Sequence, residues 1–414
     1  MKKIVILGGG FGGIRCALDC AKKLRGKAKV TLIDRNAYHS FTPALYEIAS
    51  AYQPDDDPFA LELRRAVAVP YKDIFKGKNI DFIQAEISSV DIRVSHIVLA
   101  GGGKLDFDYA VFALGAQAAD FDIPGVYDYA YQFKTTDDAV ALHNKLETSF
   151  RDAVQGRMPL PIKFLIIGAG FTGIELAAEL MMCARKLSRR HGFNRRAFSA
   201  VLFEAGPEIL PTVKEVERKK IMARLTDLGV VVMTNSAVEN VLSDSVKLKT
   251  GQTVAGTAVV WTAGVQANRL LETVHGLPVT DKGKIMVDEN LRVQNSDKLF
   301  ALGDCVEFVD PKTQKSIPGL AYHAIDQGKI TASNITAVIQ NRSSHAYKPH
   351  VNSWAVPIGG KFVLVQISSS LWVSGFLGWL IRLWIDVRYF LSILPLKKAL
   401  ALFKKDLVLF VKND

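Results

Sequence analysis

The sequence predicts an α/β protein in which one structural unit occurs twice, followed by C-terminal helices at a membrane interface. Three observations support this prediction. An apolar run, a G-x-G-x-x-G turn and a helix-like segment follow one another at 4–20 (IVILGGGFGGIRCALDC) and again at 164–180 (FLIIGAGFTGIELAAEL). The chain has 414 residues, which is too long for a single hydrophobic core. Its last part is rich in aromatic and basic residues.

Short apolar runs frame each glycine turn. They lie at 3–7 (KIVIL) and 29–33 (KVTLI) in the first unit, and at 163–167 (KFLII) and 199–203 (SAVLF) in the second. Runs of this kind are typical of strands buried in a parallel sheet, and the segments between them are long enough for a helix. We therefore predict two β–α–β units in separate domains rather than a short-period repeat.

The first glycine turn has the features of a dinucleotide site. Gly8 permits a tight turn, Gly10 lets the backbone approach a pyrophosphate, and Gly13 permits close packing of the helix. The helix that follows offers free N–H groups and a positive dipole end to the phosphates. Asp34 ends the next strand, 26 residues after Gly8, where an acid binds ribose hydroxyls. We predict a Rossmann-like dinucleotide-binding domain here.

The second turn repeats this pattern with Gly168, Gly170 and Gly173, and Glu204 closes its second strand. An acid at this place accepts a hydrogen bond from a ribose 2′-hydroxyl and repels a 2′-phosphate. No arginine stands in the next three residues to accept such a phosphate. The second site is therefore predicted to bind NADH rather than NADPH.

A third signal is the segment 298–308 (KLFALGDCVEF), in which a strand ends at Gly303 and Asp304. We predict that this strand returns to the first sheet, where the Asp304 carboxylate would bind the ribityl hydroxyls of a flavin. The first domain is then discontinuous. The predicted parts are a FAD-binding domain at 1–118 and 281–342, an NADH-binding domain at 119–280, and a C-terminal membrane-anchoring region at 343–414.

Two dinucleotide sites in one chain predict two dinucleotides that react with each other. The simplest such reaction is hydride transfer between a nicotinamide and a flavin, which the protein assists by aligning the two rings. We therefore expect FAD in the first site and NADH in the second.

The segment 371–395 (LWVSGFLGWLIRLWIDVRYFLSILP) is long enough to cross a bilayer. It carries Arg382, Asp386 and Arg388 in its middle, and each such charge costs about 2.5–3.5 kcal/mol at mid-bilayer, so a spanning helix is disfavoured. The lysine-rich segment 396–412 follows. We favour helices lying in the membrane interface; the alternative is a C-terminal helix packed on the protein or on a second subunit.

Composition sets further bounds. The net charge of +11 suits an anionic ligand, a membrane surface or nucleic acid; nothing else in the sequence indicates nucleic acid.

The four cysteines form no C-x-x-C motif and no metal cluster, so we expect no metal site and a reducing compartment. Cys16 and Cys20 are interpreted as core thiols, with a redox dithiol as the alternative. The sequence from Met1 runs directly into a strand, so no cleavable signal peptide is expected.

Four segments carry a resemblance to a known family: 36–50 (NAYHSFTPALYEIAS), 133–146 (FKTTDDAVALHNKL), 168–180 (GAGFTGIELAAEL) and 259–268 (VVWTAGVQAN). With them the whole chain resembles the type II NADH dehydrogenases (NADH:quinone oxidoreductases), which are flavoproteins with two dinucleotide-binding domains. The resemblance implies electron transfer from NADH through FAD to a membrane quinone without proton pumping. It also implies that Glu175 is the catalytic carboxylate, facing the nicotinamide and the flavin.

We expect three sets of binding residues. The FAD set is Gly8, Gly10, Phe11, Gly12, Gly13, Asp34, Arg35, Thr42, Ala113, Gly115, Gly303, Asp304 and Ala321. The NADH set is Gly168, Gly170, Thr172, Gly173, Glu204, Ala263 and Gly264. The quinone set is Pro43, Tyr322, His323 and Asp326.

One departure from the family concerns the quinone set. The family usually has A-Q-x-A-x-Q near the flavin, whereas this chain has AYHAIDQG at 321–328. Tyr322 and Asp326 therefore stand where two glutamines are expected; the phenol can donate a hydrogen bond and an ionised carboxylate cannot. His323 is a candidate proton donor to a reduced quinone, and a core or surface histidine is the alternative. A helix beginning near Leu320 would direct its positive end at the flavin.

Other enzymes of the same architecture fit less well. A sulfide:quinone reductase needs a late redox cysteine, and none follows Cys305; a disulfide reductase needs C-x-x-x-x-C in the first domain. Two alternatives stay open: a ferredoxin or rubredoxin reductase, and a membrane-bound NADH sensor with little turnover.

The expected location is the cytoplasmic face of the cell (inner) membrane, with peripheral attachment through the C-terminal helices and a possible homodimer.

Overall fold

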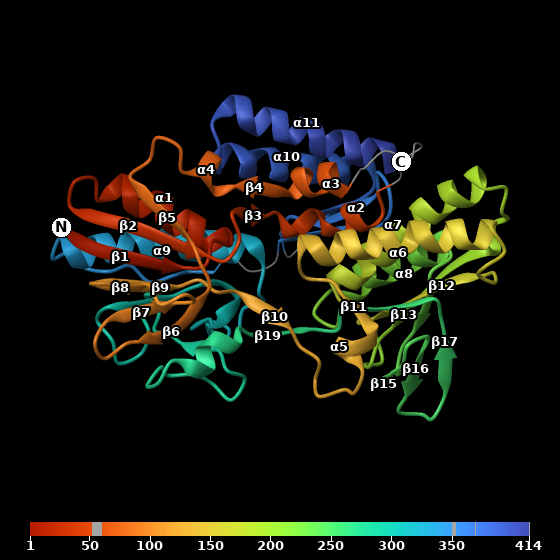
Figure 1. Cartoon of the computed structure of the whole chain (residues 1–414), viewed down its shortest axis with the longest axis horizontal. Coiled ribbons are helices and arrows are strands. Elements are labelled where there is room, and N and C mark those ends of the chain that lie inside the picture. Colours follow the sequence, from red (N-terminus) through yellow and green to blue (C-terminus); the bar gives the residue numbers. More distant parts are fainter. Residues whose placement is uncertain (52–59, 350–352, 369, 414) are drawn as a thin grey trace.

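Two parallel five-stranded sheets lie side by side along the long axis of the molecule (Figure 1). This computed structural model describes residues 1–51, 60–349, 353–368 and 370–413. The first sheet has the order β21-β9-β1-β2-β5, and all its pairings are parallel. Its strands are β1 (Lys2–Leu7), β2 (Ala28–Asp34), β5 (Ile80–Gln84), β9 (Tyr109–Phe112) and β21 (Leu299–Ala301).

The second sheet repeats this arrangement in the order β11-β18-β12-β13-β14, again with parallel pairs. Its strands are β11 (Ala130–Gln132), β12 (Ile162–Ile167), β13 (Phe198–Phe203), β14 (Val231–Met233) and β18 (Ala258–Trp261). In both sheets the inner strands are almost fully buried, which explains their continuous apolar runs. The two predicted β–α–β units are confirmed.

Strand β21 pairs with β9 although nearly 200 residues separate them, so the predicted return to the first sheet is also confirmed. The antiparallel pair of β10 (Ala116–Ala118) and β19 (Val265–Ala267) carries the chain between the two halves (Figure 1). The residue limits of the two domains stay a prediction.

Smaller sheets of two or three strands accompany the two large sheets. They are β3 (Tyr38–Ser40) with β4 (Ala68–Pro70); β6 (Ile87–Asp91), β7 (His96–Leu99) and β8 (Lys104–Asp106); β15 (Val238–Val241), β16 (Ser245–Leu248) and β17 (Thr253–Ala255); and β20 (Ile285–Met286) with β22 (Val306–Glu307).

Helices follow the sheet strands and connect the smaller elements. They are α1 (Phe11–Lys23), η1 (Thr42–Ala44), α2 (Leu45–Ala49), α3 (Ala60–Val67), α4 (Tyr71–Ile74), α5 (Val126–Tyr129), α6 (Thr136–Val154), α7 (Phe171–Arg190), η2 (Arg195–Ala197), α8 (Glu215–Leu228), η3 (Arg269–Thr273), η4 (Gly303–Cys305) and α9 (Ala321–Ile339). Helices α1 and α9 pack so closely that a Cβ atom on Gly328 would lie 2.5 Å from the Gly12 carbonyl oxygen.

The C-terminal region contains a sheet that the sequence did not predict: β23 (Trp354–Pro357), β24 (Val363–Gln366) and β25 (Trp372–Val373). Helices α10 (Phe376–Ile393) and α11 (Leu396–Asn413) follow and lie together along one side of the molecule, over α3 and α4 (Figure 1). Among the described helices, none combines the length and the apolar character needed to cross a bilayer.

Helix α10 has two different apolar faces. Tyr389, Phe390 and Ile393 are buried in the same core cluster that contains Ile4 of β1 and Phe164 of β12. The other face leaves large apolar side chains in solvent. Between 40% and 64% of each side chain is exposed at Phe376, Leu377, Leu380, Trp384, Ile385 and Leu391. The helix is therefore packed on the protein, as the alternative interpretation expected, and it also presents an apolar surface. Contact of this surface with a membrane stays a prediction.

Candidate functional site

The predicted FAD residues of the first half meet at one edge of its sheet. The glycine turn that begins at Gly8 follows β1, Asp34 ends β2, Ala113 follows β9, and Gly303 lies two residues beyond β21. These strands are parallel, so their carboxyl ends lie at the same edge, which is where nucleotides bind in such sheets.

The first glycine turn needs its glycines for different reasons. Gly8 has φ +103°, and a Cβ atom there would lie 2.4 Å from the Ala113 carbonyl oxygen. A Cβ atom on Gly13 would lie 2.0 Å from the Gly8 oxygen. At Gly10, by contrast, a Cβ atom would meet nothing within 4 Å, so this backbone faces open space in front of α1. The turn leaves room for a diphosphate at the helix N-terminus.

The Asp34 carboxylate holds this turn in shape. Its Oδ2 accepts a hydrogen bond from the Gly9 N–H at 2.7 Å, and its Oδ1 accepts one from the Asn36 N–H at 2.8 Å. A carboxylate has about four acceptor positions, so Asp34 retains capacity for ribose hydroxyls.

The second glycine turn repeats this geometry. Gly168 has φ +104°, and a Cβ atom there would lie 2.5 Å from the Ala263 Cα. A Cβ atom on Gly173 would lie 2.0 Å from the Gly168 oxygen, whereas one on Gly170 would meet nothing within 4 Å. The tight positions and the open position are therefore the same in both copies.

Glu204 takes the place of Asp34 in the second half. Its Oε2 accepts from the Ala169 N–H at 3.2 Å, and its Oε1 accepts from the Gly206 N–H at 2.9 Å. Thr172 is exposed in the first turn of α7, and Gly264 follows β18 against the Phe121 ring. The predicted NADH residues thus lie along the carboxyl edge of the second sheet.

The remaining FAD residues surround the first turn. Phe11 and Gly12 begin α1, Arg35 is exposed after β2, and Thr42 is exposed on η1. Gly115 has φ +65° with open space at its Cβ position.

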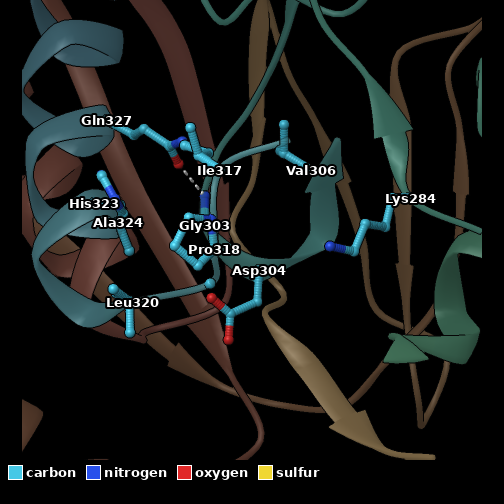
Figure 2. A pocket seen from close by; sticks show the side chains of 11 residues that line it. Lys284, Gly303, Asp304, Val306, Ile317, Pro318, Leu320, His323, Ala324 and Gln327 are labelled. Carbon is cyan, nitrogen blue, oxygen red and sulfur yellow. Dashed lines mark hydrogen bonds between the residues drawn. The ribbon is translucent and has the colours of Figure 1, made fainter. Parts of the chain in front are cut away.

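A pocket lies between η4 and the N-terminus of α9, and Figure 2 shows Gly303, Asp304, His323 and Gln327 around it. The Gln327 Oε1 accepts from the Gly303 N–H at 2.6 Å. Ala321 is the first residue of α9, which confirms a helix beginning near Leu320, and its N-terminus lies beside the Asp304 segment. That this end faces a flavin stays a prediction.

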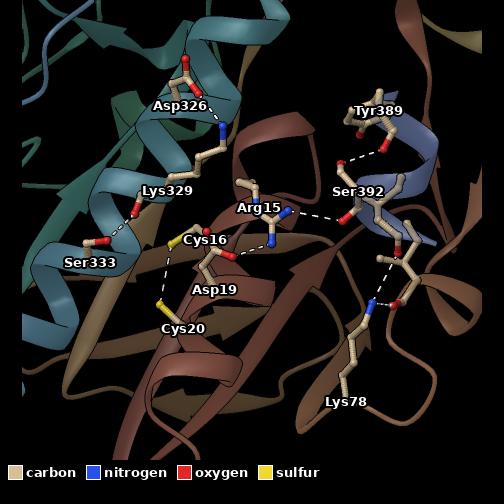
Figure 3. Close-up of polar contacts among 12 residues, drawn as sticks. Arg15, Cys16, Asp19, Cys20, Lys78, Asp326, Lys329, Ser333, Tyr389 and Ser392 are labelled. Atoms are coloured by element: carbon tan, nitrogen blue, oxygen red, sulfur yellow. Dashed lines mark hydrogen bonds and ion pairs between the residues drawn. The ribbon is translucent and has the colours of Figure 1, made fainter. Parts of the chain in front are cut away.

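The predicted quinone residues of α9 differ in their surroundings. His323 is 3% exposed, and its Nδ1 lies 3.0 Å from the Tyr347 hydroxyl oxygen. Tyr322 is half-buried against the His323 ring, and burial raises its pKa to about 12. Asp326 Oδ1 accepts from Lys329 Nζ at 2.7 Å (Figure 3). His323 therefore lines the pocket as a buried histidine, and the Asp326 charge is balanced by a lysine.

Glu175 is the fifth residue of α7, a helix that packs against α2 of the first half. Burial raises its pKa from the ordinary 4.5 to about 8, although the nearby Arg382 charge acts in the opposite direction. The carboxyl group is therefore largely protonated near neutral pH.

These features agree with comparisons to known proteins. Residues 2–328 match the family model described as pyridine nucleotide-disulphide oxidoreductase. The chain belongs to this family. A type II NADH:quinone oxidoreductase of Haemophilus influenzae is 29% identical over 381 residues, covering 84% of this chain and 83% of that protein. One of Staphylococcus aureus is 29% identical over 357 residues, covering 84% and 85%. The resemblance predicted from the sequence is confirmed.

Solved structures support the fold. The Plasmodium falciparum NDH2 structure in complex with NADH has a TM-score of 0.86 at 19% identity and covers 98% of this chain and 97% of its own. The Aquifex aeolicus sulfide:quinone oxidoreductase has a TM-score of 0.75 at 18% identity, with coverages of 95% and 91%.

The structure shows the surroundings of the four cysteines. All four are buried and unbonded. Cys16 and Cys20 lie inside α1 with their Sγ atoms 4.0 Å apart (Figure 3), and the contact with Cys20 together with burial raises the pKa of the Cys16 thiol. A buried thiol with a raised pKa is unreactive, so their interpretation as core thiols is confirmed.

Sequence reasoning missed a buried ion pair on α10 that contacts the predicted quinone residue Pro43. Arg382 and Asp386, the charges that disfavoured a spanning helix, pair with each other inside the protein and are 6% and 1% exposed. Arg382 Nη2 also donates to the Pro43 carbonyl oxygen at 3.2 Å. The signal was the i, i+4 spacing of opposite charges in an apolar helix.

Proposed function

We propose that the chain is a flavoprotein that passes electrons from NADH through FAD to a membrane quinone, without moving protons across the membrane. The observation that carries this proposal is the pair of matching glycine turns, each with one open glycine and one acid at a strand end. The names of the relatives support the choice of NADH as donor and quinone as acceptor.

The residues of the first half fit a flavin dinucleotide. The turn from Gly8 to Gly13 would hold the diphosphate, Asp34 the adenosine ribose, and Asp304 the ribityl hydroxyls. When bound, FAD supplies the chemistry of accepting a hydride and releasing electrons to a second substrate. The N-terminus of α9 would stabilise negative charge on the reduced ring system.

The residues of the second half fit NADH. The open Gly170 would admit its diphosphate, and Glu204 would accept from the ribose 2′-hydroxyl and repel the phosphate of NADPH. Ala263 and Gly264 would border the nicotinamide half, because they lie at the carboxyl end of β18 next to the turn.

Glu175 is the proposed catalytic carboxylate. It comes from the helix of the NADH site and lies against α2 of the FAD site, so it stands between the two nucleotides. Because its pKa is raised to about 8, it holds a proton at neutral pH that can pass toward the quinone. Pro43 and Tyr322 would border the quinone, and the Tyr322 hydroxyl is the better donor because Asp326 is ion-paired.

We infer a lipid surface as the partner of the exposed α10 face. Trp384 and Leu377 are 64% and 63% exposed, and Leu396 and Leu400 at the start of α11 extend this apolar surface. Exposed lysines at 397, 404 and 405 suit an anionic headgroup layer. This favours peripheral attachment at the cytoplasmic face, where anionic lipids attract a positively charged protein. A second copy of the chain is the alternative occupant.

The test uses purified protein added to closed quinone-containing vesicles with a pH-sensitive dye inside. The proposal predicts one quinol formed per NADH consumed, with no pH change inside the vesicles. Quinol formation together with a sustained internal pH change would contradict the absence of pumping. NADH oxidation that depends on a ferredoxin-like protein, and not on quinone, would favour the rival acceptor.

A further inference from the structure

The carbonyl oxygen of Gly9, in the middle of the first glycine turn, accepts two hydrogen bonds from buried side chains. The Tyr71 hydroxyl donates to it at 2.8 Å, and His39 Nδ1 lies 3.2 Å away. Both side chains are 1% exposed. A Cβ atom on Gly9 would lie 2.0 Å from the Tyr71 hydroxyl oxygen, so this contact also requires glycine.

The far side of the His39 ring contacts the C-terminal helix. The Tyr389 hydroxyl of α10 lies 2.7 Å from His39 Nε2, across 350 positions of sequence. The Phe11 ring packs against both partners, with centroid distances of 4.8 Å to His39 and 4.9 Å to Tyr389. A side chain of the C-terminal region thus reaches the glycine turn before α1 through one imidazole.

The directions of these hydrogen bonds follow from the chemistry of the groups. A carbonyl oxygen only accepts, so His39 Nδ1 must carry the proton that bonds to Gly9. A neutral imidazole has one N–H, so Nε2 accepts and the Tyr389 hydroxyl must donate. Burial lowers the pKa of His39 to about 4, which keeps the ring neutral at physiological pH.

The orientation of the Gly9 carbonyl determines where the next N–H points. The peptide between Gly9 and Gly10 is trans, so its C=O and N–H point in opposite directions. With the oxygen held by Tyr71 and His39, the Gly10 N–H points away from them. It donates to no acceptor among the described residues, and the space at Gly10 is open. This is the donor expected to meet a diphosphate.

We propose that Tyr389 is a positioning residue for the FAD diphosphate: it holds the tautomer and orientation of His39, which in turn directs the Gly10 N–H outward. The inference rests on the proposed function, since it takes FAD as the ligand of this turn. It makes α10 part of the cofactor site as well as the carrier of the exposed apolar face. Deleting the chain from Leu371 onward would therefore remove flavin-site support together with any membrane contact.

The test is the dissociation constant of FAD for full-length protein, measured by the fluorescence of released flavin, in wild type and variants. Tyr389→Phe keeps the ring and removes only the hydroxyl, so it is expected to fold and to weaken FAD binding roughly tenfold. His39→Leu should weaken it further. His39→Asn places an amide N–H near the Nδ1 position and should bind FAD more tightly than His39→Leu.

A matched control separates this role from general docking of the C-terminal helices. Lys398 of α11 pairs with Asp73 and has no contact with the turn. Lys398→Met is expected to leave FAD affinity within about twofold of wild type, and the KM for NADH should stay unchanged in both Tyr389→Phe and Lys398→Met.

Two results would overturn the inference: unchanged FAD affinity in Tyr389→Phe, or equal weakening in Lys398→Met. Wild-type protein that does not bind FAD would instead overturn the proposed function itself.

Discussion

The Arg382 guanidinium of α10 donates to the carbonyl oxygen of Pro43, 3.2 Å away, and so joins the C-terminal helix to the segment that leads into α2. Arg382 also pairs with Asp386, and both side chains are almost fully buried. Removing one partner of such a pair leaves the other charge buried alone.

Arg382→Met is therefore expected to lower the free energy of unfolding by about 3–5 kcal/mol. The double variant Arg382→Met/Asp386→Leu should recover much of this loss because no buried charge remains. Urea unfolding of the three proteins measures both effects. A single variant as stable as wild type would show that the pair is solvated in solution.

The raised pKa of Glu175 predicts a pH-dependent stability. Between its unfolded value near 4.5 and its folded value of about 8, the folded state binds more protons at this group, so its contribution to stability falls as pH rises. Glutamine does not titrate, so the free energy of unfolding of Glu175→Gln should not fall in this way. Its stability relative to wild type should therefore rise between pH 5 and pH 8.5. Urea unfolding at several pH values and matched flavin content checks this; a constant difference would contradict the burial of the carboxyl group.

Two neighbouring glycines should respond differently to alanine. At Gly10 a methyl group would enter open space, so Gly10→Ala should lose flavin but keep the thermal stability of the flavin-free wild-type protein. At Gly12 it would lie 2.3 Å from a Leu302 methyl carbon and 2.7 Å from the Ala324 oxygen, so Gly12→Ala should lower the melting temperature itself. Flavin absorbance and thermal unfolding of both variants separate the two effects. Full flavin content in Gly10→Ala would exclude a diphosphate at this position.

Glu204→Gln keeps the size and the acceptor oxygen of the side chain but removes its charge. Hydrogen bonds to charged groups contribute about 1.5–3 kcal/mol, so the KM for NADH should rise by roughly tenfold or more. The preference for NADH over NADPH should shrink at the same time, since the repulsion of the 2′-phosphate is lost. Steady-state kinetics with both nucleotides give the ratio. An unchanged ratio would remove Glu204 from the ribose site.

The exposed face of α10 predicts vesicle binding. Replacing Leu377 and Trp384 together by serine should reduce co-sedimentation with anionic vesicles severalfold, because each buried side chain of this size contributes about 1.5–3 kcal/mol. Val216→Ser on α8 is the control, since Val216 is 66% exposed on another helix. A double variant that still binds vesicles but loses self-association would assign the face to a second copy.

The parts of the site that depend on local pattern could be predicted from sequence. The glycine turns and the acids Asp34 and Glu204 are such features, because strand, turn and helix succeed one another within about 30 residues. The contacts of α10 could not: Tyr389 meets His39, and Arg382 meets Pro43, only because the C-terminal helix folds back over the first half. Aromatic side chains that suggested lipid contact are divided between the core and the surface, with Trp379 buried and Trp384 exposed. Hydrophobicity alone does not tell these two environments apart.

The central claim is that electrons pass from NADH to a flavin held by this chain and then to quinone. The most direct measurement is the visible spectrum of the purified protein in the absence of oxygen. The account predicts a yellow protein whose flavin absorbance bleaches on addition of NADH and returns on addition of a short-chain quinone. A colourless protein that does not take up FAD, or a flavin that NADH does not bleach, would contradict it.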